Sequence, residues 1–184
     1  VLRAILYKIV FKKVGFPSYV GKPIFLLGTK KISLGSRVRI FPMCRMEVHG
    51  AQSEIVIKDN VSIGQGFHII SGGRLVIESG VLIAPGVFVN DMDNDYHEID
   101  VPVFDQRQIV KETHIGENCF IGIGACIQAG TTLGKQCVVG AGAVVKGIFP
   151  DFCVIVGNPA IIIKRYDIES KKWKKTNPKG EFLS

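Results

Sequence analysis

Hydrophobic residues recur at every sixth position over much of the C-terminal half of the chain. Between Ile115 and Pro150 an aliphatic residue opens each block of six, at positions 115, 121, 127, 133, 139 and 145. A small residue follows four positions later in the first five blocks: Cys119, Ala125, Thr131, Cys137 and Ala143. Helices and ordinary strands have shorter periods. A chain that turns a corner every six residues has a period of six, so the pattern predicts a parallel β-helix.

The same register continues upstream with interruptions. Aliphatic residues open the blocks in three further runs: Leu34, Ile40 and Met46; Ile57, Ile63 and Ile69; Ile77, Ile83 and Val89. Three hexapeptides make one triangular coil of about 18 residues, and neighbouring coils stack about 4.8 Å apart. We therefore expect five or six coils. The predicted fold class is all-β, with a short N-terminal helix, an excursion loop and a C-terminal tail or helix added to the β-helix.

The two ends of the chain have a different pattern from the repeat. The segment 1–16 spaces its apolar residues as a helix does (Leu2, Ile5, Leu6, Ile9 and Val10). Such a helix can cover the open edge of the first coil. The alternative is a basic amphipathic helix on a membrane surface, at its inner face. The predicted divisions are a lead-in at 1–22, the β-helix at 23–160 with an inserted loop at 90–113, and a basic extension at 161–184. Trp173 favours docking of that extension.

Cysteine usage and charge restrict the partners and the compartment. The chain has five cysteines, and three of them (Cys44, Cys119 and Cys137) fall in the small inward slot of the repeat. They are interpreted as reduced core residues, which predicts a cytoplasmic location. The net charge of +7 comes without a clustered arginine stripe, so no nucleic acid partner is expected. A phosphate-bearing cofactor or an acidic polysaccharide explains the charge equally well.

The repeat disappears after Val89, where a polar segment is excluded from the wall of the prism. It contains one histidine, His97, among several carboxylates: Asp91, Asp93, Asp95, Glu98 and Asp100. An imidazole can accept and return a proton near neutral pH, and a neighbouring carboxylate can fix its tautomer. A catalytic base is one interpretation. A solvated acidic loop with an incidental histidine is the other.

The hexapeptide blocks, the D-N-D-Y-H-E-I-D loop and the G-N-P-A motif at 157–160 together resemble the hexapeptide-repeat acyltransferases. The resemblance covers roughly residues 23–166, and is strongest to the sugar and capsular polysaccharide O-acetyltransferase branch. It implies a left-handed coil, acetyl-CoA as the donor, no metal, and a homotrimer whose active sites lie between neighbouring prisms.

The resemblance also implies roles for residues in and near the loop. His97 matches the general base for the acceptor hydroxyl, and Asp95 is the better candidate to orient it, with Asp93 as the alternative. The acceptor would attack the acetyl thioester directly. Gln65, His68 and Asp93 are candidate contacts for the acceptor.

The donor site that the resemblance implies lies along the corners of the last coils. Its pantetheine contacts match Ile123 and Gly124 and, one coil later, Ala141 and Gly142. The nucleotide end is expected near a further set of residues: Lys146, Pro159, Lys164 and Arg165. Two positions depart from the family pattern, because Ile161 stands where Arg or Lys is frequent and Phe120 stands where many relatives have Trp.

The leading hypothesis is an acetyl-CoA-dependent O-acetyltransferase that acts on a sugar hydroxyl of a cell-surface polysaccharide or its precursor. The alternatives are an N-acetyltransferase for an amino sugar, an antibiotic-inactivating acetyltransferase and, without catalysis, a trimeric β-helix scaffold. A zinc-dependent β-helix enzyme needs three converging histidines, whereas the four histidines of this chain are scattered.

Overall fold

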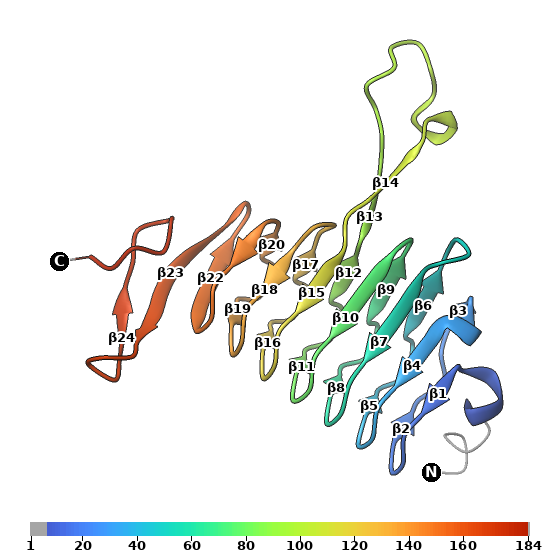
Figure 1. Ribbon diagram of the computed structural model, residues 1–184, viewed down its shortest axis with the longest axis horizontal. Coiled ribbons are helices and arrows are strands. Elements are labelled where there is room, and N and C mark those ends of the chain that lie inside the picture. The colour runs from blue at the N-terminus through green and yellow to red at the C-terminus, as the bar shows by residue number, and fades with distance from the viewer. Residues whose placement is uncertain (1–6, 184) are drawn as a thin grey trace.

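The computed structural model describes residues 7–183, and these residues form a three-sided prism of short parallel strands (Figure 1). Each coil of the chain contributes one strand to each of three sheets, which we call sheets A, B and C.

The bounds of the strands follow the three walls. Sheet A contains β1 (Lys13–Val14), β4 (Ile32–Leu34), β7 (Glu54–Ile57), β10 (Arg74–Ile77), β15 (Thr113–Ile115), β18 (Thr132–Leu133) and β21 (Ile148–Phe149). Sheet B contains β2 (Tyr19–Val20), β5 (Arg39–Ile40), β8 (Ser62–Ile63), β11 (Leu82–Ile83), β16 (Phe120–Ile121), β19 (Val138–Val139), β22 (Cys153–Gly157), β23 (Ala160–Asp167) and β24 (Lys172–Lys175). Sheet C contains β3 (Phe25–Leu27), β6 (Arg45–Val48), β9 (His68–Ser71), β12 (Phe88–Asn90), β17 (Cys126–Ile127) and β20 (Val144–Val145).

The prism begins earlier than the repeat pattern predicted. Strands β1 and β2 pair in parallel with β4 and β5, so the first coil starts at Lys13 rather than at residue 23. Val14 and Val20 fill its inward positions. Within residues 13–157 the chain completes six coils and starts a seventh, against the five or six expected. The short helix η1 (Thr29–Lys31) interrupts the six-residue period after the first coil. The repeat in the sequence is therefore regular only from Leu34 onward.

The inward positions of the repeat build one continuous hydrophobic core. Ile57, Ile63 and Ile69, which open three successive blocks, are buried, as are their counterparts in the later coils. The predicted inward cysteines are also buried, and all five cysteines are free thiols. Burial raises the pKa of the Cys44 thiol to about 11, so this side chain stays protonated and packs as a small hydrophobe.

At the N-terminus, residues 7–10 are helical, and Phe11 is buried in the core directly after them. Leu2, Ile5 and Leu6, on which the amphipathic helix was predicted, lie outside the described residues. The helix ends before Lys13, which is already in β1. No helical segment within residues 7–183 has the length and apolar character needed to span a bilayer.

The C-terminal extension contains two strands, β23 and β24, where the sequence predicted a tail or a helix. Strand β23 folds back antiparallel on β22, and β24 pairs with β23 (Figure 1). Trp173 packs against Tyr166 with ring centroids 5.7 Å apart. The added strands cover the last parallel edge of sheet B, which would otherwise stay open to pairing.

We expect the inward isoleucines to dominate stability. Ile121→Ala removes a fully buried side chain and should lower the free energy of unfolding by about 2–5 kcal/mol. Ile148→Ala is the matched control, since Ile148 is 83% exposed on sheet A and should change stability by less than about 0.5 kcal/mol. Urea unfolding followed by circular dichroism measures both. Equal effects of the two variants would contradict the assigned inward register.

Candidate functional site

A loop leaves the prism at the corner where sheet C passes into sheet A. The chain departs after β12 and returns at β15, and in between β13 (Met92–Asn94) and β14 (Gln108–Val110) pair as an antiparallel ribbon that projects from the prism (Figure 1). The short helix η2 (Val103–Asp105) lies beyond the ribbon. The segment that breaks the hexapeptide period is therefore an ordered arm rather than a part of the wall.

A buried carboxylate anchors the root of this arm. Asp91 is fully buried, and its two oxygens accept hydrogen bonds from Ser71 Oγ at 2.7 Å and from the backbone N–H groups of Gly72 and Gly73 at 2.7 and 3.2 Å. Burial raises the pKa of Asp91, although these hydrogen bonds oppose the effect. Because all three donors belong to the coil below, Asp91 ties the arm to the wall.

A buried amide fixes the outer part of the arm. The Oε1 atom of Gln106 accepts a hydrogen bond from the Glu98 backbone N–H at 3.1 Å, and its Nε2 donates to the carbonyl oxygens of Glu98 and Val101 at 3.0 and 2.8 Å. The surrounding tip is apolar and open, since Ile99 is 82% exposed and Phe104 is 95% exposed. The tip thus has a defined shape and an unpartnered apolar surface within this chain.

Between root and tip, the arm holds His97 against Asp95. The Nδ1 atom of His97 is hydrogen-bonded to Asp95 Oδ1, and the backbone N–H groups of Tyr96 and His97 donate to the same oxygen at 2.9 and 3.2 Å. Arg107 donates from Nε to the other oxygen, Oδ2, at 2.9 Å. The imidazole stacks on the Tyr96 ring at a centroid distance of 4.8 Å.

This arrangement determines the protonation of the pair. The hydrogen bonds from His97 and Arg107 hold the pKa of Asp95 well below its usual range, so the carboxylate is ionised. An ionised carboxylate only accepts hydrogen bonds, so Nδ1 of His97 must donate, and the lone pair of a neutral ring then lies on Nε2. The His97 side chain is 72% exposed and that of Asp95 only 11%. The pair can therefore take a proton from a molecule bound outside the arm.

Asp93, the alternative partner, does not contact His97. It is exposed on β13 and its carboxylate lies 3.9 Å from Nζ of Lys146. The structure therefore brings Asp95 to the imidazole. It also places Lys146 at the corner between sheets C and A, beside the root of the arm, rather than with the candidate donor residues.

The candidate donor residues share a different edge of the prism. Ile123 and Gly124 form the corner between sheets B and C in one coil, and Ala141 and Gly142 form the same corner one coil later, where the Gly142 N–H donates to the Ile123 carbonyl at 2.9 Å. Gly124 and Gly142 both have a φ of 65°, a left-handed conformation that favours glycine, and face open space. Pro159 lies in the turn from β22 to β23, where the next coil would place this corner.

Lys164 and Arg165 do not lie at that edge. Strand β23 runs back across sheet B, so Arg165 is opposite Cys153 at the start of β22. Its Nη1 atom donates to the Gly180 carbonyl at 3.1 Å, and its guanidinium lies over the Phe182 ring. The sequence placed these cations next to G-N-P-A in the chain, but the hairpin carries them to the far side of the sheet.

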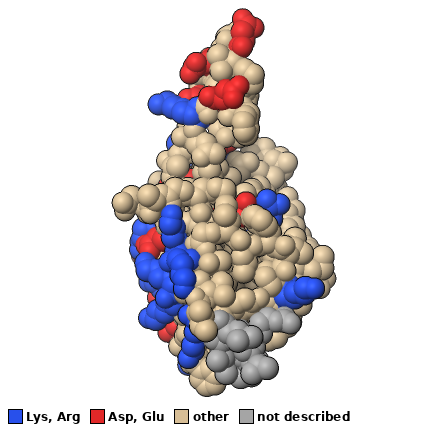
Figure 2. All heavy atoms as spheres, turned by 90° about the vertical axis from the view of Figure 1, so that its right-hand side faces the viewer, with Lys and Arg blue, Asp and Glu red and all other residues tan. Residues whose placement is uncertain are grey.

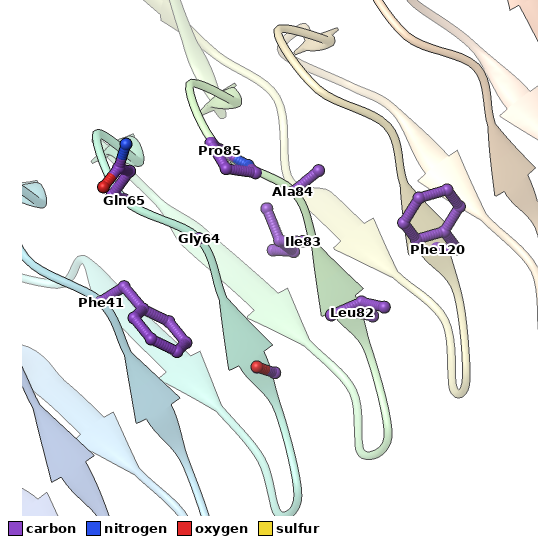
Figure 3. Close-up of a pocket in the computed structure, with 9 residues that line it drawn as sticks. Phe41, Gly64, Gln65, Leu82, Ile83, Ala84, Pro85 and Phe120 are labelled. Atoms are coloured by element: carbon purple, nitrogen blue, oxygen red, sulfur yellow. The ribbon is translucent and has the colours of Figure 1, made fainter.

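Gln65 borders a shallow hollow on the outer face of sheet B (Figure 3). The hollow has a volume of about 340 Å³ and is lined mainly by apolar side chains of successive coils, including Phe41, Leu82 and Phe120. Gln65 and Pro85 lie at its border, on the edge that also carries Gly124. Phe120 therefore presents an aromatic surface beside the candidate donor edge.

His68 lies on sheet C and belongs to a polar cluster that the sequence analysis did not identify. Its Nε2 atom lies 3.0 Å from Oε1 of the buried Glu47, which also accepts a hydrogen bond from Arg45 Nε at 2.5 Å. The hydrogen bond from Arg45, with that from His68, holds the pKa of Glu47 below its usual range. The signal for this cluster is pairing across adjacent coils, and the spacing along one strand does not reveal it.

Charge is divided between the arm and the prism. Figure 2 shows acidic side chains gathered on the arm and a band of Lys and Arg along one side of the prism below it. Within residues 7–183, no three His, Cys, Asp or Glu side chains lie close enough together to hold a metal ion.

The similar proteins bear the names of probable or putative acetyltransferases. The family model described as hexapeptide repeat of succinyl-transferase matches residues 112–146. The chain is 31% identical to the putative lipopolysaccharide biosynthesis O-acetyl transferase WbbJ of Escherichia coli, over 83% of this chain and 81% of WbbJ. It is 30% identical to the probable acetyltransferase Rv3034c of Mycobacterium tuberculosis, over 79% of this chain but only 49% of that protein.

Solved structures share the architecture. AntD, an N-acyltransferase from Bacillus cereus in complex with dTDP and 3-hydroxybutyryl-CoA, superposes with a TM-score of 0.73 at 21% identity, over 91% of this chain and 90% of AntD. At this identity the likeness concerns the fold alone. The left-handed parallel β-helix predicted from the sequence is confirmed.

We expect Asp91→Ala to detach the root of the arm. The substitution leaves the partly buried N–H groups of Gly72 and Gly73 without an acceptor, which should cost about 1–3 kcal/mol of stability. Hydrogen exchange should increase in residues 91–112 more than in the strands of the prism. Exposed Glu112→Ala is the control on the same arm. Unchanged protection of the arm in Asp91→Ala would contradict the anchoring role.

Proposed function

This chain belongs to the hexapeptide-repeat acetyltransferase family, and on that premise we propose that it transfers an acetyl group from acetyl-CoA to a sugar hydroxyl in a cell-surface polysaccharide or its precursor. Membership rests on the similarity to WbbJ over most of both chains. The observation that carries the proposal is the Asp95–His97 pair, with its imidazole exposed on an ordered arm.

The pair supports direct acetyl transfer. Nε2 of His97 takes the proton of the acceptor hydroxyl as the oxygen attacks the thioester carbonyl. The tetrahedral intermediate then collapses, the C–S bond breaks, and the proton on the imidazole passes to the sulfur of the departing CoA. Asp95 remains ionised throughout and stabilises the imidazolium that forms between the two steps. No acyl-enzyme is needed in this sequence.

The donor is proposed to lie along the edge between sheets B and C. Ile123, Gly124, Ala141 and Gly142 form two consecutive small corners there, and Pro159 follows in the same direction. Backbone groups at such corners can hydrogen-bond an extended pantetheine arm when no bulky side chain intervenes. Lys164 and Arg165 are separated from this edge by the width of sheet B, so they lie away from the proposed pantetheine contacts.

The two halves of the proposed site lie on different edges of one prism. The arm leaves between sheets C and A, whereas the donor corners lie between sheets B and C. A homotrimer with parallel prisms would bring the arm of one copy to the donor edge of the next. The exposed Ile99 and Phe104 at the tip provide the apolar surface such packing requires.

The proposal includes a compartment for the activity. The five free cysteines fit a reducing compartment, and we place the activity in the cytoplasm on that ground.

Acylation of an amino sugar is the second candidate, and the fold shared with the N-acyltransferase AntD is the observation that favours it. An acceptor panel that includes both neutral and amino sugars separates the two.

We expect His97→Ala to abolish most of the turnover. Loss of a general base should lower kcat/KM by about 10²–10⁴-fold, measured as CoA thiol release from acetyl-CoA with a panel of sugars. His114→Ala is a matched control, since His114 also lies next to a carboxylate, with Nε2 3.2 Å from Glu78, but on sheet A. A wild-type protein that neither turns over nor binds acetyl-CoA would refute the enzyme and leave a scaffold.

The donor edge is tested separately from the base. Ala141→Leu places bulk at an exposed corner and should raise KM for acetyl-CoA about tenfold, which corresponds to about 1.4 kcal/mol of binding, with a smaller effect on kcat. Ala51→Leu makes the same change at an exposed corner between sheets C and A, and should leave KM unchanged. Equal KM values for both variants would place the donor elsewhere.

A further inference from the structure

Arg107 lies beside the Asp95–His97 pair, on the opposite side of the arm. The Asp95 N–H donates to the Arg107 carbonyl at 2.9 Å, and Arg107 Nε donates to Asp95 Oδ2, also at 2.9 Å. We propose that Arg107 is a positioning residue for the reaction, which holds Oδ2 of Asp95 and places a positive charge that offsets the charge of this carboxylate next to the His97 imidazole. The inference rests on the proposed role of His97 as the base.

The two carboxylate oxygens of Asp95 accept hydrogen bonds from different groups. Oδ1 receives the His97 ring and the backbone N–H groups of Tyr96 and His97, while Oδ2 receives Arg107. With both oxygens engaged, the carboxylate has little freedom to rotate away from the imidazole. The ring is thereby held with Nδ1 toward Asp95, and Nε2 is left to meet the acceptor hydroxyl.

The positive charge of Arg107 opposes the effect of the Asp95 carboxylate on the neighbouring imidazole. A carboxylate next to an imidazole favours the imidazolium, and a protonated ring cannot accept a proton from the acceptor. The charged groups at the pair are Asp95, directly after β13, and Arg107, directly before β14, while Tyr96 covers one face of the ring. The nearby Asp93 is compensated by Lys146. Arg107 therefore offsets the negative charge of Asp95 next to the ring.

A purely structural role for Arg107 has little support in the geometry. Its side chain is 80% exposed and forms one hydrogen bond to Asp95, and exposed ion pairs of this kind contribute little to stability. The arm is held instead by Asp91 at its root and by Gln106 near its tip. Removal of the guanidinium should therefore change the pH dependence of the reaction more than the fold of the arm.

The experiment compares Arg107→Gln with Arg107→Lys, which keeps the positive charge. Lys111→Gln is the matched control, because Lys111 is an exposed cation on the same returning segment and its backbone N–H, not its side chain, binds Asp91. Two quantities are measured for each protein. The first is the titration midpoint of His97 by NMR of ¹⁵N-histidine-labelled protein without substrates, and the second is kcat/KM between pH 5.5 and 9.

For Arg107→Gln we expect the midpoint of His97 to move upward by about 0.5 to 1 pH unit, since a positive charge near the ring is lost. The acidic limb of the kcat/KM profile should move by the same amount, so that activity falls about three- to tenfold at low pH and approaches wild type at high pH. Arg107→Lys and Lys111→Gln should keep the wild-type midpoint.

An unchanged NMR midpoint of His97 in Arg107→Gln would overturn the proposal, whatever the change in kcat/KM. A fall of the midpoint would do the same. The NMR titration needs no substrate, so it stands apart from the enzymatic assay. A protein in which the midpoint moves but no acetyl group is transferred would overturn the proposed function, while the effect of Arg107 on His97 would stand.

Discussion

The inward aliphatic side chain of each hexapeptide is the constraint on which the rest of the molecule depends. These side chains share one continuous core, and to place them there the chain turns three corners in every coil. The turns set the positions of everything functional, because outward residues at equal places in successive coils stack in straight rows. The candidate donor edge is one of these rows. Its residues can be small because the inward side chains of the strands fill the hydrophobic core, and the corner residues do not contribute to it.

Against this rigid wall, the arm is stabilised by polar contacts instead of a core. Asp91 is buried at its root and satisfied by three donors, and Gln106 links its outer segments through both ends of one amide. Such contacts are directional, so the arm can project from the prism and still hold an exposed imidazole in one orientation. The division suits a site that must be both accessible and ordered. It also explains why the acidic residues of the sequence gather here, since several of them bind backbone or neighbouring side chains rather than solvent.

The separation of the arm from the donor edge bears on how the protein can work. Each prism carries the Asp95–His97 pair on an arm at one corner and small, open residues at another corner, and sheet C lies between them. Acetyl transfer by an isolated chain would require an acceptor and a thioester to meet across that sheet. The proposed assembly of several copies would remove this difficulty, because the arm extends beyond its own prism (Figure 1).

The sequence by itself determined the β-helix, its excursion and the histidine within it. Periodicity is a local property, so Ile115 to Pro150 revealed the coil, and the break after Val89 revealed the arm with Asp95 and His97 two residues apart. Contacts between distant segments were decided only by the tertiary structure. Arg107 reaches Asp95 because β13 and β14 pair, and Glu47 reaches His68 because two coils stack. Lys164 and Arg165 leave the donor edge because β23 reverses direction. In each case the contact depends on hydrogen bonding between strands that are distant in the sequence, and such pairing leaves no regular spacing in the chain. A buried side chain in every hexapeptide, by contrast, leaves a regular spacing of six residues.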